Sequence, residues 1–279
     1  MDHEESSTHL WIVNRGVEIL GTHTRDAVAR RVFTLMNEPL CRAQWQQGLY
    51  DADYKADYNN GLTDLPKNPS EAQVLLSGAT WESHFYDPDT GKNYKGGTTR
   101  TALTEADKHM SRSLELGFGV NKREACYELG LALHYFTDLT QPMHASNFTA
   151  LSRPAKLHVN LEGYAMELQD KYPLADWTGA PRTVPLKDFV RETAVQTKPL
   201  FQEGVTAIIN AYNTYSGWHF LRCRKVDAQM IRFLERQYVD HRVCWQGNPG
   251  VDATVGKSLM FAQDRTAQYL YLLSKRIAN

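Results

Sequence analysis

The sequence lacks several features that would each point to a particular class of protein. No run of about twenty apolar residues occurs, so no transmembrane helix is expected. The formal net charge is only -1, which disfavours tight nucleic-acid binding because such binding usually needs a strongly positive surface. The segment Met1–Glu5 is acidic and polar, so it is not a secretory signal. The protein is therefore either cytoplasmic, or its signal is absent from this sequence.

Cysteine is scarce, with four in 279 residues, and no two of them form a C-x-x-C pair. A thiolate zinc site or a redox motif is therefore not expected. Cys126 lies in an apolar helical run and is expected to be a buried thiol. Cys223 and Cys244 flank one predicted helix and would form a disulfide only in an oxidising compartment. The sequence leaves that pairing open, because the separation of their Cα atoms is unknown.

Apolar residues recur mostly at helical spacing, and few segments alternate as strands do. Residues 55–80 are rich in Asn, Gly, Pro and Asp and are predicted to form a long loop. No internal repeat or clear linker occurs. The sequence thus predicts one all-α domain over residues 1–279, with eight to ten helices. Helices are expected over residues 8–20, 25–37, 40–49, 103–118, 186–213, 226–240 and 254–277, besides those around the segment described next.

The segment Leu131–Glu162 holds an unusual concentration of histidine and carboxylate side chains. Two pairs, His134 with Asp138 and His158 with Glu162, are spaced i,i+4, so each pair shares one face of a helix. Pro142 should end the first of these helices, and His144 follows on the next turn. Inward-facing imidazole and carboxylate pairs hold metals in helical bundles. Because the set contains no thiolate, it favours zinc with open coordination positions.

The pattern H-x3-D-x5-H-x13-H-x3-E, from His134 to Glu162, resembles that of the bacterial zinc-dependent phospholipase C family. Three upstream pieces resemble it too, and the similarity covers nearly the whole chain. They are S-T-H-L-W-I-V-N-R around His9, G-L-Y-D-A-D-Y around Asp53 and S-H-F-Y-D-P-D-T-G-K around His84. The resemblance implies an all-helical domain that holds three zinc ions.

The resemblance also implies which residues hold each ion. Asp53, His84, His134 and Asp138 would bind one zinc, and His144, His158 and Glu162 a second. The third would be held by His9, by Asp138 as a bridge, and by the N-terminal residue through its backbone atoms. In the family that residue is a Trp, whereas position 1 here is Met1. Met1 can replace it only with a free, correctly placed terminus.

The activity implied is hydrolysis of the glycerol-side phosphodiester of phosphatidylcholine and related phospholipids, giving diacylglycerol and a phosphorylated head group. A zinc-activated water would attack phosphorus in line. Asp53 is implied as the general base for that water, although a role as ligand only is equally consistent with the sequence. Tyr54 and Trp81 match aromatic positions that border the family's choline pocket, where a quaternary ammonium gains cation–π attraction. For Trp81 the alternative is simple packing under the loop.

The resemblance further implies an exported protein that acts on phospholipid at a membrane or micelle surface. It implies no nucleic-acid partner and no stable protein partner, so a monomer is expected. The chain ends in a predicted helix, and no additional C-terminal lipid-binding domain is expected. The remaining histidines match no family ligand and are interpreted as surface or packing residues: His3, His23, His109, His219 and His241.

Two other functions are open from the sequence. The first is a zinc-dependent nuclease specific for single strands, which shares the helical fold. That family typically has a longer gap before its last His and ends in Asp rather than Glu, and it needs a basic groove with stacking aromatics. The second is a non-catalytic protein with structural metals, which would need closed coordination. A carboxylate-rich set with Asp138 as a bridge favours open sites and hence an enzyme.

Overall fold

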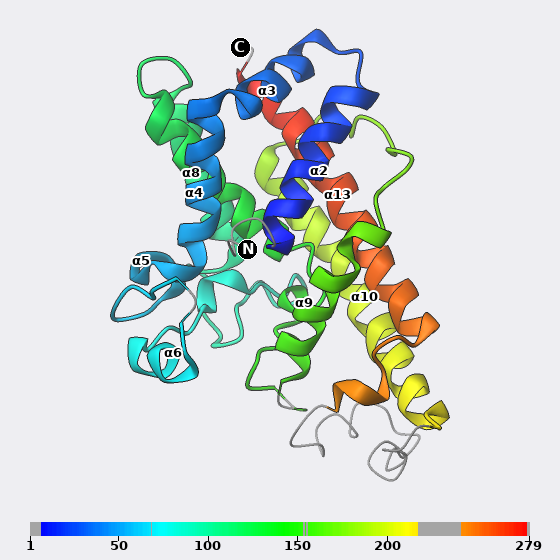
Figure 1. Cartoon of the computed structure of the whole chain (residues 1–279). Coiled ribbons are helices and arrows are strands. Elements are labelled where there is room, and N and C mark those ends of the chain that lie inside the picture. Colours follow the sequence, from blue (N-terminus) through cyan, green and yellow to red (C-terminus); the bar gives the residue numbers. More distant parts are fainter. Residues whose placement is uncertain (1–6, 68, 153, 155, 217–240, 278–279) are drawn as a thin grey trace.

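The computed structural model describes residues 7–67, 69–152, 154, 156–216 and 241–277 (Figure 1). Within these ranges it contains α-helices and short 3-10 helices, no β-strand, and one isolated bridge between Asp87 and Lys92. The all-α prediction is therefore confirmed. The helices are α2 (Thr8–His23), α3 (Ala27–Asn37), α4 (Pro39–Tyr54), α5 (Ala56–Asn59), α6 (Glu71–Ser77), η1 (Glu82–His84), α7 (Ala102–Leu116), α8 (Lys122–Asp138), η2 (His144–Ser146), α9 (Leu157–Leu168), η3 (Gln169–Lys171), α10 (Leu186–Thr214), η4 (Arg242–Cys244) and α13 (Pro249–Ile277).

Helix α8 is the centre of the fold. It packs between α4 and α7, while α13 packs against α2 and α10 on the other side of the molecule (Figure 1). Every residue from Leu129 to Asp138 is buried, so this half of α8 is covered on all sides. The helix ends at Asp138, four residues before Pro142, as the sequence predicts. Its buried C-terminal half therefore carries His134 and Asp138 into the interior.

Two glycines allow α4 and α8 to approach closely. A Cβ atom on Gly130 would lie 2.1 Å from the carbonyl oxygen of Trp45. A Cβ atom on Gly48 would lie 2.2 Å from the carbonyl oxygen of Tyr127. Both distances are far below van der Waals contact with a backbone atom that cannot move by itself. Only glycine fits at these positions, and the contact fixes how far the end of α4 lies from the end of α8.

The prediction of a free thiol at Cys126 is wrong. Cys126 forms a disulfide with Cys41, with the two Cα atoms 5.2 Å apart and a sequence separation of 85. The pairing results from the α4–α8 contact, which the sequence alone does not reveal. Closing a loop of this length stabilises the fold by about 4.5 kcal/mol in the chain-entropy account. The other pairing considered, Cys223 with Cys244, involves residue 223, which lies outside the described residues.

The segment 55–80 is more ordered than the predicted loop. It contains α5 and α6, and α6 begins with a capping box in which Ser70 and Gln73 bond reciprocally. Each of these helices is shorter than two turns. Such a helix is too short to show a periodic apolar pattern in the sequence. Elsewhere the predicted helices match with shifted ends; α13, for example, begins at Pro249 rather than near residue 254. The helix expected over 226–240 lies outside the described residues.

None of the helices that the structure describes is both long and apolar enough to span a membrane.

Candidate metal centre

Helix α8 presents His134 and Asp138 one turn apart, and each side chain is 1% exposed. Asp53 comes to them from the last turn of α4, and His84 from the short helix η1. The Asp53 Oδ1 atom lies 3.6 Å from His134 Nε2 and 3.8 Å from His84 Nδ1. The two imidazole nitrogens lie 3.2 Å apart. The structure therefore brings together the four side chains that the resemblance assigns to one metal ion.

The second group comes from η2 and α9. His158 and Glu162 are one turn apart on α9, and His158 Nε2 lies 2.8 Å from Glu162 Oε1. His144 Nε2 lies 3.2 Å from the same carboxylate oxygen. The ligand atoms of the three side chains lie within 4.8 Å of one another, as expected from the sequence.

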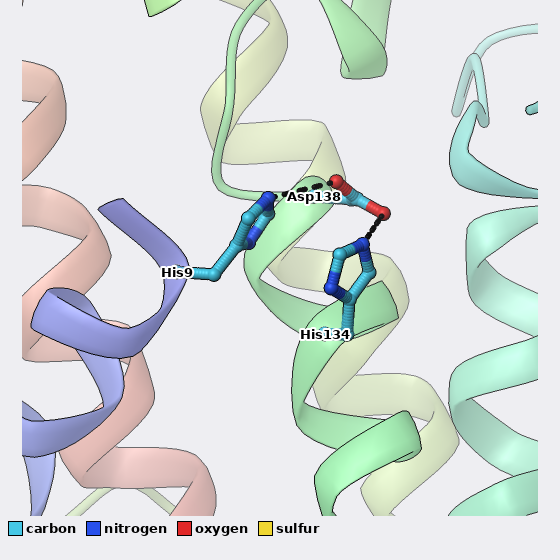
Figure 2. A group of neighbouring side chains, drawn as sticks. All are labelled: His9, His134 and Asp138. Atoms are coloured by element: carbon cyan, nitrogen blue, oxygen red, sulfur yellow. Dashed lines mark ion pairs between the residues drawn. The ribbon is translucent and has the colours of Figure 1, made fainter. Parts of the chain in front are cut away.

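The third group gathers around His9, in the first turn of α2 (Figure 2). His9 Nε2 lies 3.6 Å from Asp138 Oδ1, as the sequence predicts for a bridging carboxylate. The structure also places His134 in this group, since the rings of His9 and His134 stack with centroids 4.3 Å apart. Met1, the remaining predicted ligand, lies outside the described residues.

Asp138 joins the three groups. Its carboxylate oxygens lie 2.9 Å from His84 Nδ1, 3.3 Å from His144 Nδ1, 3.5 Å from His134 Nε2 and 3.6 Å from His9 Nε2. Despite these neighbours, the buried Oδ2 atom of Asp138 accepts no hydrogen bond. The buried Nε2 atom of His84 also has no hydrogen-bond partner. A buried carboxylate oxygen without a donor costs free energy unless a cation satisfies it.

The hydrogen bonds made by the outer ring nitrogens indicate where that cation belongs. His134 Nδ1 lies 2.7 Å from the Leu49 carbonyl oxygen, which can only accept, so Nδ1 carries the proton. Nε2 then presents a lone pair towards the carboxylates of Asp53 and Asp138. Burial lowers the pKa of His134 to about 4, so a second proton does not bind at neutral pH. Acceptors that face one another in this way fit a metal ion between them.

The spacing and chemistry of the donors also fit zinc. Ligand atoms at about 2.0–2.1 Å from a tetrahedral zinc ion lie about 3.3 Å apart. In the first group, around His134, and in the second group, around His158, the measured distances between ligand atoms are 2.8 to 3.8 Å. The donors are imidazoles and carboxylates, which suit zinc sites with open positions.

Two carboxylates of the centre, Asp138 and Glu162, are held in their ionised form. Burial raises the pKa of Asp138, but the imidazoles of His134, His144 and His84 outweigh it and keep the pKa below its ordinary value. Burial likewise opposes ionisation of Glu162, and His158 and His144 again lower the pKa. These anionic oxygens are therefore available as ligands across the neutral range.

The two predicted head-group residues flank Asp53. Trp81 donates a hydrogen bond from its indole Nε1 to the Asp53 carbonyl oxygen, at 3.2 Å. Tyr54 follows Asp53 directly, and its ring stacks on that of Tyr50 with centroids 4.2 Å apart. Burial raises the pKa of Tyr54 to about 12, so its hydroxyl remains protonated. Trp81 is thus held against the backbone of Asp53, and Tyr54 is the neighbour of Asp53 in the chain.

The sequence reasoning missed the groups that orient the ligands. Thr137 Oγ1 lies 2.7 Å from His9 Nδ1 and itself bonds to carbonyl oxygens of its own helix. The His84 carbonyl oxygen lies 2.9 Å from His144 Nδ1, so one candidate ligand positions another. Such partners fix the tautomer and the ring plane of a metal-binding histidine. Thr137 could have been found from the sequence, because it is a small polar residue directly before Asp138. The backbone carbonyl oxygens that orient the histidines could not, because they leave no signal in a sequence.

Comparisons with known proteins agree with this geometry. A family model described as zinc dependent phospholipase C matches residues 8–241. A phospholipase C of Bacillus cereus is 32% identical, over 97% of this chain and 82% of that protein. A phospholipase C of Listeria monocytogenes is 33% identical, over 72% of this chain and 63% of that protein.

Among solved structures, the alpha toxin from Clostridium absonum superposes with a TM-score of 0.62 at 21% identity. The superposition covers 98% of this chain and 64% of the toxin chain, so the toxin is the longer of the two. At this identity the likeness shows only that the toxin and this chain share a fold.

Proposed function

Because the chain belongs to the zinc-dependent phospholipase C family, we propose that it hydrolyses the glycerol-side phosphodiester of phosphatidylcholine and related phospholipids. The products are diacylglycerol and a phosphorylated head group. The observation that carries the proposal is the meeting of eight candidate ligand side chains from six elements, with the buried Asp138 at their centre. The nuclease alternative is not favoured, since the matches are to phospholipases C.

The eight side chains would hold three zinc ions, in the three groups described above. Bound zinc supplies Lewis-acid chemistry, neutralises the phosphate charge and makes water more acidic. Asp53 is better placed than Asp138 to accept the proton of the attacking water, because its side chain is 40% exposed while that of Asp138 is 1% exposed. Asp138 is enclosed by imidazoles and serves as the bridge. Met1 remains the proposed backbone ligand of the third ion.

Tyr54 and Trp81 would receive the choline group. The positive charge of a quaternary ammonium is attracted to aromatic faces, and both residues adjoin Asp53. A head group held there would place its phosphate towards the metal groups. The arrangement therefore supports a preference for phosphocholine esters.

The partner we propose is a membrane or micelle surface, with the protein acting as a monomer and no stable protein partner. Among the described residues, three exposed leucines lie on α6 and on the loop that pairs with its end. Leu62 is 85% exposed, Leu75 81% and Leu76 79%. Leu62 bonds through its amide to the Ser77 carbonyl oxygen, so the three leucines lie close together. Apolar side chains gathered on a surface favour contact with lipid.

An exported protein is the localisation we propose. The disulfide between Cys41 and Cys126 supports it, because such bonds persist in oxidising compartments and are rare in the cytosol.

The proposal predicts that zinc-loaded protein converts phosphatidylcholine vesicles to diacylglycerol and phosphocholine, since the metal centre supplies the attacking water. Mass spectrometry of both products is the measurement. Treatment with a chelator should lower the rate by at least about 1,000-fold, corresponding to about 4 kcal/mol of lost barrier reduction. Returning zinc should restore it.

The same preparation should be incubated with single-stranded DNA as a control. Cleavage of the DNA with intact phosphatidylcholine would overturn the proposal in favour of a nuclease. Release of choline in place of phosphocholine would show that a different phosphodiester bond is cleaved.

A further inference from the structure

A cavity of about 440 Å³ extends from the metal centre into the protein. Five of the eight candidate ligands line one end of it, namely His9, Asp53, Asp138, His144 and Glu162. The other end lies between α2, α9, α10 and α13, which run beside one another in Figure 1. The volume falls within the range of about 300–1,000 Å³ that is usual for ligand pockets.

The deep end of this cavity is apolar. Helix α10 lines it with Leu200, Val205 and Ile208, and α13 lines it with Val255 and Leu259. The described residues that α10 and α13 contribute include no charged side chain; Thr254 and Ser258 are their polar members. Such a surface excludes a second phosphate or a sugar, and it fits a hydrocarbon.

The rim of the cavity is apolar as well. Val159 and Met166, on α9, line the cavity and are exposed to solvent. A hydrocarbon chain entering here would therefore meet apolar side chains from the surface to the deep end. The charged groups are confined to the end that carries the metal ligands.

The part of the chain before Thr8 is a poor occupant for such a surface. Its residues 1–6, M-D-H-E-E-S, include three carboxylates and a histidine and a single apolar side chain. A chain with this composition would have to leave its charges unpaired in the apolar end. A hydrocarbon tail avoids that cost.

We propose that the cavity between α2, α9, α10 and α13 binds one acyl chain of the phospholipid substrate while the phosphodiester lies at the metal centre. This proposal rests on the proposed phospholipase C function and adds the site for the chain. Tyr54 and Trp81 are absent from the described lining of the cavity, whereas Asp53 is part of it. The head group and the bound acyl chain would thus contact different residues and meet at Asp53. The cavity then makes the enzyme sensitive to acyl-chain length.

Gly204 is a position from which the cavity can be filled. It lines the cavity from α10, and a Cβ atom built on it meets nothing within 4 Å. Gly204→Leu and Gly204→Phe place increasing apolar volume there, while Gly204→Ala leaves most of the space open. Each replaces a glycine in the interior of a helix, so none should lower the stability. Gly204→Ala is the matched control.

The test is calorimetric binding of hexyl, octyl and decyl phosphocholine to the zinc-loaded protein, below the concentrations at which they form micelles. In the wild type and in Gly204→Ala, Kd should fall about fourfold for each added methylene, the equivalent of about 0.8 kcal/mol per buried methylene. In Gly204→Leu, and more so in Gly204→Phe, Kd should change less than twofold along the series. The variants should keep the wild-type affinity for phosphocholine itself.

An equal gain per methylene in all four proteins would overturn the proposal, because the chains would then bind elsewhere. No gain in the wild type would overturn it as well. Binding does not depend on turnover, so these results stand whether or not phosphatidylcholine is hydrolysed. Turnover of phosphatidylcholine with a flat binding series would refute the cavity and leave the proposed function intact.

Discussion

Asp138→Asn should lower kcat/KM for phosphatidylcholine by at least about 1,000-fold. The replaced carboxylate lies within 3.6 Å of four imidazoles and is 1% exposed. Losing its charge removes the bridge between the metal groups, and breaking a buried charge pair typically costs about 3–5 kcal/mol. The zinc content measured by elemental analysis should fall together with the activity.

Asp176→Asn is the matched control, because Asp176 is exposed and lies in the connection before α10. It should retain wild-type activity and zinc. If Asp138→Asn kept both its zinc and its turnover, the bridging role of this carboxylate would be wrong.

A companion variant separates the two roles open to Asp53. The amide of Asp53→Asn keeps a ligand oxygen but cannot accept a proton, so turnover should fall with zinc retained if Asp53 is the general base. Loss of zinc in step with activity would instead indicate a role as ligand only. The measurement is the rate per bound zinc ion, compared with that of the wild type.

Gly130→Ala should have the largest effect on stability. The added Cβ would lie 2.1 Å from the Trp45 carbonyl oxygen, so α4 and α8 would have to move apart. Overpacking of this kind commonly costs about 1–3 kcal/mol or more, and a contact with backbone belongs at the upper end. We expect the free energy of unfolding in urea to fall by about 3 kcal/mol.

The same separation should displace Asp53, at the end of α4, from His134 on α8, and so weaken zinc binding. Gly204→Ala provides the matched control, because its Cβ has open space and should leave stability equal or slightly higher. An unchanged urea midpoint in Gly130→Ala would show that the glycine contact does not set the distance between the helices.

The ligands could be found from the sequence because their spacing is local. His134 with Asp138 and His158 with Glu162 have the i,i+4 register of a helix, and Pro142 marks where the first helix has to end. The structure adds His9, Asp53 and His84 at the positions that the resemblance implied. Local periodicity and short motifs were therefore sufficient to predict the fold class and to name side chains that the structure brings together.

Contacts between distant segments were not visible in the same way. The Cys41–Cys126 disulfide and the fit of Gly130 against Trp45 both depend on how α4 packs on α8. The apolar side chains that line the cavity have the same periodicity as those of an ordinary core. Only the structure distinguishes a helix face that is packed from one that leaves space for a ligand.

The most direct test of the metal centre is to locate zinc in crystals of the protein by anomalous diffraction at its absorption edge. The account predicts three peaks in each chain. One should lie among Asp53, His84, His134 and Asp138, one among His144, His158 and Glu162, and one beside His9 and Asp138. A single peak, or peaks away from these side chains, would contradict the trinuclear centre on which the proposed function depends.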